Sequence, residues 1–179
     1  MDADHRVHMT ARVADAGAPP PRPAAPPGRD STSLLVAEEI VVEYHLGRGE
    51  LDQAGEAIQR MKELRPSDPW NLTFEGYLAA LRGDEETARH FLAELDELTR
   101  HGNRTVFMAG FVHFALGEMD AFYMRMSQAL QLHDLPLLQL MYSPLFAAAR
   151  GKLRFRALLE AQRALHESQS ASDGDNFRP

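Results

Sequence analysis

Histidine is the residue type best suited to bind metals or move protons near neutral pH, and this 179-residue chain has eight. A metal site or a catalytic base needs histidines that converge with one another or with carboxylates. His5 and His8 lie in an N-terminal segment without apolar periodicity, where nothing preorganises a set of ligands. Four others are scattered over different predicted helices and turns, without an acid at ligand spacing: His90, His101, His113 and His133. The sequence therefore predicts no metal site.

Catalytic motifs are missing as well. The chain has no cysteine, which excludes thiolate nucleophiles and disulfides. It has no His-Glu-x-x-His motif, no phosphate-binding glycine loop and no nucleophile elbow. Its paired acids, such as Glu38 and Glu39, are sequence neighbours, and neighbours on a helix point about 100° apart. We therefore predict no catalytic residues and no cofactor, and we expect that the protein is not an enzyme.

Composition and charge limit the partners that the chain can have. With 44% hydrophobic and 25% charged residues, it has the profile of a globular protein. The net charge is −7, with 15 acids and 7 bases in residues 31–102 and 5 acids and 7 bases in residues 103–169. Such sparse basicity disfavours nucleic-acid binding. The longest apolar run, 106–116, has about half the length that spans a bilayer. We expect a cytoplasmic protein without a membrane contact.

A proline- and alanine-rich segment precedes the part of the chain with apolar periodicity. Residues 1–32 contain too few large apolar side chains to offset the entropy cost of ordering, so we predict a disordered tail. Helical periodicity begins near Ser33, and we predict one folded domain over residues 33–168. The polar residues 169–179 are expected to form a second disordered tail.

The folded part repeats with a period of 34 residues. A glycine followed by an acid recurs at this interval, in Gly49-Glu50, Gly83-Asp84 and Gly117-Glu118. Other positions keep the same register: Gly76 with Gly110, Ala54 with Ala88, Ile58 with Leu92 and Met126, and Leu64 with Leu98 and Leu132. A fixed period of this length is typical of stacked helix-turn-helix units.

These columns resemble the pattern of the tetratricopeptide repeat (TPR) family. The register divides the chain into repeats at about 35–68, 69–102 and 103–136, with a cap at 137–168. The segment Ser143-Pro144-Leu145-Phe146, followed by 153–159, is similar to the ends of TPR regions attached to bacterial cyclases, kinases and winged-helix activators. The resemblance implies an all-α, right-handed solenoid of about three TPR hairpins plus C-terminal capping helices.

In TPR proteins the first helix of each repeat lines a concave groove. Carried over to this chain, these positions predict a partner-binding groove formed by Trp70, Thr73, Tyr77, Arg104, Phe107, Phe111 and Phe114. Repeat one adds Val36, Glu39 and Glu43 at the equivalent positions. The resemblance thus implies an aromatic groove with an acidic edge.

Such a groove suits a peptide or an amphipathic helix with apolar and basic side chains. We therefore predict a protein-protein interaction module of the scaffold or adaptor kind. Two alternatives stay open. The groove is either a sensor site for a small apolar ligand or signalling peptide, or its rings are covered by the last helix of the chain or by a second copy through self-association.

Overall fold

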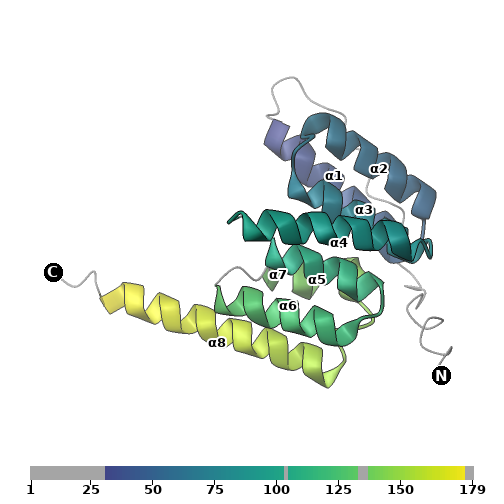
Figure 1. Cartoon of the computed structure of the whole chain (residues 1–179). Helices are drawn as coiled ribbons and strands as arrows, with labels where there is room; N and C mark the ends of the chain where they lie inside the picture. The colour runs from purple at the N-terminus through teal and green to yellow at the C-terminus, as the bar shows by residue number, and fades with distance from the viewer. Residues whose placement is uncertain (1–30, 103–104, 133–136, 176–179) are drawn as a thin grey trace, which may run out of the picture.

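The computed structural model describes residues 31–102, 105–132 and 137–175, and this part of the chain is helical (Figure 1). The elements are α1 (Ser31–Arg48), α2 (Leu51–Leu64), α3 (Pro69–Leu81), α4 (Glu85–Arg100), α5 (Val106–Ala115), α6 (Met119–Gln131), α7 (Leu137–Tyr142), the 3₁₀ turn η1 (Pro144–Phe146) and α8 (Leu153–Asp175). The all-α prediction is confirmed for the described residues. The predicted tail of residues 1–32 lies outside them, apart from the start of α1.

The first six helices pack as three consecutive pairs: α1 with α2, α3 with α4, and α5 with α6. Adjacent pairs are joined by contacts of α2 with α3 and of α4 with α5, and α3 also packs against α5. Helices α1, α3 and α5 are the first helices of the three pairs, and we call their side that faces away from α2, α4 and α6 the inner face.

The first and second helices of the pairs differ in how much of their surface is buried. In α2 and α4, apolar side chains at three- and four-residue spacing are buried against the neighbouring helices, and polar side chains cover the other side. Helices α3 and α5 are buried over most of their surface, and their sequences are correspondingly apolar. A helix that is apolar around its circumference needs cover on every side.

The three Gly-acid turns have the same backbone geometry. Gly49, Gly83 and Gly117 have φ values of 72°, 79° and 76°, a left-handed conformation that glycine adopts without a Cβ penalty. In each turn, the N–H of the following acid donates to the carbonyl five residues earlier, at 2.9 Å. This is the Schellman ending of a helix, and it explains why the glycines recur every 34 residues.

Two glycines inside helices mark close packing. A Cβ added at Gly76 would lie 3.0 Å from Val112 Cγ2 on α5 and 3.1 Å from Phe91 Cβ on α4. A Cβ at Gly110 would run into Met126 on α6. Glycine costs up to about 1 kcal/mol relative to alanine in a helix interior, and here it lets neighbouring helices approach closely.

After α7 the chain turns a corner, which begins at Ser143 and includes η1, and then forms the long helix α8. Ser143 caps η1 by accepting a hydrogen bond from the N–H of Leu145 at 3.2 Å. Helix α8 packs on α6 and α7 through its first turns and then extends away from the bundle (Figure 1). It continues to Asp175, past Ser168, where we predicted its end, because a formed helix propagates readily through a segment without proline.

The close packing between helices generates a first prediction. Ala88 is fully buried in α4, whereas Ala93 of the same helix is exposed. Ala88→Leu should destabilise the protein by about 1–3 kcal/mol, because added methylenes in a packed core force side chains and backbone apart. Ala93→Leu is the matched control and should be nearly neutral. Urea unfolding of both variants measures the difference, and equal effects would contradict the packing.

Candidate functional site: the inner face

The predicted groove residues lie on α3 and α5 and are mostly covered. Thr73, Tyr77, Phe107, Phe111 and Phe114 are buried, and Trp70 is partly buried. Arg104 lies outside the described residues. The structure thus places the rings in the protein interior.

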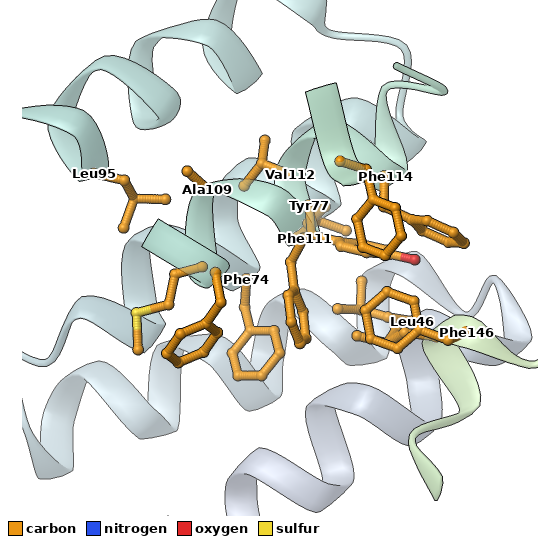
Figure 2. Close-up of a cluster of buried hydrophobic side chains, with 14 of the residues drawn as sticks. Leu46, Phe74, Tyr77, Leu95, Ala109, Phe111, Val112, Phe114 and Phe146 are labelled. Atoms are coloured by element: carbon orange, nitrogen blue, oxygen red, sulfur yellow. The ribbon is translucent and has the colours of Figure 1, made fainter. Parts of the chain in front are cut away.

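The rings of Trp70, Phe107 and Phe111 pack against one another. The centroid of Trp70 lies 5.8 Å from that of Phe107 and 5.5 Å from that of Phe111. Phe146 of η1 completes the cluster, with centroid distances of 4.8 Å to Phe111 and 4.9 Å to Phe114. The Trp70–Phe107 contact is tilted, and the other three are edge-to-face, an arrangement that the ring quadrupole favours. Figure 2 shows Phe146 in the same cluster as Phe111 and Phe114.

The corner before α8 brings Phe146 to this position by docking against α1. The guanidinium of Arg150 donates to the carbonyl of Ser143 at 2.7 Å and fixes the turn. Gly47 of α1 leaves room for the corner, since a Cβ there would lie 2.7 Å from Pro144 Cβ. The side chain of Ser143 also hydrogen-bonds to Glu43. The inner face is therefore closed at this end by the chain's own corner.

Carboxylates lie beside this closure in an environment that disfavours their charge. Burial raises the pKa of Glu43, although its hydrogen bond to Ser143 acts in the opposite direction. Burial, together with the nearby charge of Glu43, raises the pKa of the Tyr77 hydroxyl. Tyr77 therefore stays neutral, and Glu43 retains its proton to a higher pH than an exposed glutamate.

Glu39, one turn earlier on α1, is shifted further. Burial raises its pKa to about 7, and the charges of Asp68 and Glu43 add to the shift, while Arg65 opposes it. It has no hydrogen-bond or ion-pair partner within the part of the chain described. Burial and the surplus of negative charge around Glu39 make this a position where a further cation would be favourable.

Exposed apolar side chains adjoin Glu39. Val36 and Ile40 are 48% and 56% exposed, although both are large and apolar. On a helix, residues three and four positions apart are surface neighbours, so Val36, Glu39, Ile40 and Glu43 form one continuous surface, which we call the α1 strip. The corner covers its Glu43 end, and its Val36 end is open.

The sequence analysis missed the histidine-glutamate pairs. His90 and His101, for which we predicted no acid at ligand spacing, lie 2.8 Å and 3.2 Å from the carboxylates of Glu94 and Glu97. Two further pairs cross the Gly-acid turns. The Nδ1 atoms of His45 and His113 lie 2.7 Å and 2.6 Å from the carboxylates of Glu50 and Glu118. The recurrence was visible, since both pairs are separated by twice the 34-residue period. Hydrogen bonds from Arg48 and His45 lower the pKa of Glu50. Each of these two pairs spans a Gly-acid turn, so His45 and His113 stabilise turns.

Within the described residues, no three histidine or acid side chains are placed to hold a metal ion. In that same part of the chain, no helix has the length and apolar character needed to span a bilayer. Comparison with protein-family models, curated proteins and solved structures gave no match. The site is therefore interpreted from its own geometry.

The central position of Phe146 generates a second prediction. Phe146→Ala should destabilise the protein by about 3–5 kcal/mol, because a fully buried ring is removed from an aromatic cluster. Tyr142→Ala, in the same segment at a residue that is 71% exposed, should cost little. Denaturant unfolding followed by near-UV circular dichroism measures both. A small effect at Phe146 would mean that the corner is loosely held.

The raised pKa of Glu39 generates a third prediction, for stability as a function of pH. The folded-state pKa of about 7 exceeds the ordinary glutamate pKa of 4.5, so the folded state binds more protons than the unfolded chain between these two pH values. The contribution of Glu39 is thus fully present below pH 4.5 and is lost as the pH rises to about 7. Glu39→Gln should remove this loss and make the variant more stable than the wild type at about pH 8.

Thermal unfolding between about pH 5 and 8 tests this prediction. Glu56→Gln, an exposed change on α2, is the control and should keep the wild-type pH dependence. Parallel pH profiles for the wild type and Glu39→Gln would show that Glu39 titrates normally.

Proposed function

We propose that the protein is an interaction module of the TPR type, which holds a segment of another polypeptide on its inner face. The paired helices and the Gly-acid turns repeated every 34 residues support this proposal. The C-terminal motif around Ser143 is similar to the ends of TPR regions attached to bacterial regulators.

The observation that carries the proposal is the open end of the α1 strip. Helix α1 has apolar residues around its circumference, a composition typical of a helix with cover on all sides. Its partner α2 covers one side and η1 covers the C-terminal part of another, but Val36 and Ile40 are left exposed. Exposed apolar surface next to polar groups is typical of protein-protein contact sites.

The buried aromatic cluster favours a polypeptide over a small apolar ligand. A sensor site for a small apolar ligand was left open as an alternative for the predicted groove, but Phe146 packs directly on Phe111 there. The remaining exposed apolar surface on α1 is elongated along the helix. An extended or helical segment matches that shape better than a compact molecule.

A pair of substitutions tests the function. Val36→Ser combined with Ile40→Ser should abolish the capture of a partner, because it removes the apolar side chains of the strip, and it should cost little stability because both are exposed. Met124→Ser on α6, also at an exposed apolar residue (51%), is the matched control and should keep the partner. Affinity capture with quantitative mass spectrometry, followed by binding of the purified partner, measures the effect.

The same set of proteins captured by the wild type and by the double variant would contradict the proposal. Circular dichroism of both variants establishes that the fold is kept, so that a loss of binding is assigned to the surface.

A further inference from the structure

The α1 strip combines exposed apolar side chains with a partly buried carboxylate. We propose that it binds an amphipathic segment of a partner protein, whose apolar side chains cover Val36 and Ile40 and whose lysine or arginine pairs with Glu39. This inference rests on the proposed function and specifies the partner's chemistry at the same site.

The apolar part of the argument follows from helix geometry. Positions 36, 40, 43 and 47 lie along one side of α1, at three- and four-residue intervals. The last two of these residues are already covered: Glu43 by the hydroxyl of Ser143, and Gly47 by the ring of Pro144. The first two are exposed. A partner segment would therefore continue, along the same side of the helix, the cover that the corner begins.

The contacts made by the corner show which kinds of side chain pack on this side of α1. It places an apolar ring against Gly47 and a hydrogen-bonding side chain against Glu43. One turn earlier, the strip again presents apolar groups beside a glutamate, but without a donor. Because Glu39 is half-buried and has no partner among the described residues, a donor that carries positive charge satisfies it better than a neutral hydroxyl does.

The surrounding charges favour a cation as well. The groups that face Glu39 are Glu43 on α1, Asp68 and Arg65 from the α2–α3 turn, and no lysine is among them. Arg65 lies 3.9 Å from Asp68, with which it forms a long ion pair. The neighbouring Glu38 is already paired with Arg60 at 2.9 Å. The site thus has an excess of carboxylates, and an ammonium or guanidinium group would complement it.

Protonation is linked to this binding. A pKa of about 7 means that Glu39 is about half protonated at neutral pH. A cation binds the ionised form and therefore displaces the proton. Binding should then strengthen as the pH rises from about 6 to 8, until Glu39 is fully ionised. Neutral contacts with Val36 and Ile40 have no such pH dependence.

Synthetic peptides test the inference on the full-length chain. The probe is an amphipathic 18-residue helix of leucine and lysine, and the comparison peptides are its leucine-glutamate counterpart and a scrambled leucine-lysine sequence without an apolar face. Fluorescence anisotropy at about pH 6, 7 and 8 measures the affinity. The wild type should bind the amphipathic lysine peptide at least about tenfold more tightly than either comparison peptide.

Variants then assign the contacts. Glu39→Gln should weaken binding of the lysine peptide by about tenfold at pH 8 and flatten its pH dependence, as expected for the loss of a charge-assisted hydrogen bond. Glu56→Gln, which removes the same charge from an exposed site on α2, should change neither. Val36→Ser with Ile40→Ser should abolish binding at every pH.

The outcomes separate the inference from the proposed function. If the apolar double variant loses binding but Glu39→Gln retains both the affinity and the pH dependence, the assigned role of Glu39 is wrong and the interaction surface stands. If binding is unchanged in both variants, or if the scrambled peptide binds equally well, the α1 strip is not the docking site, and the proposed function loses the observation that carries it.

Discussion

Phe146 occupies the space between the first and third helix pairs, and the arrangement of the inner face depends on it. Its ring contacts Phe111 and Phe114 on α5, and the turn that carries it docks on α1 at Gly47. Helices α3 and α5 pack directly on each other, whereas α1 is held across the inner face by η1. The aromatic cluster therefore joins the two ends of the hairpin stack.

This closure places carboxylates where they oppose folding. The pKa values of Glu39 and Glu43 are both raised mainly by burial. The folded state would therefore be more stable with a neutral side chain at either position. A stability cost at a surface that is also apolar and open is typical of binding sites, where function and stability make opposite demands on the same residue. The exposed Val36 and Ile40 fit this interpretation.

The sequence predicted the repeating part better than the closure. Glycines such as Gly83 are required locally, because the helix ends there in a left-handed conformation. This requirement recurs at a fixed interval, so it can be recognised in the sequence. The resemblance to TPR proteins grouped Trp70, Phe107 and Phe111 on one predicted groove, and their rings pack together in the interior instead. Their cover by Phe146 depends on a contact between distant segments, which no local pattern specifies. The raised pKa of Glu39 depends on the same long-range geometry.

The contact of Gly47 with Pro144 has a consequence for synthesis of the chain on the ribosome. In an open solenoid each unit contacts only its neighbours, so that folding can follow the nascent chain unit by unit. Here α1 emerges first, but the corner that covers it is made about a hundred residues later. During that interval the apolar side of α1 is accessible to chaperones and to other nascent chains, and the first hairpin reaches its final environment only after the corner has been synthesised.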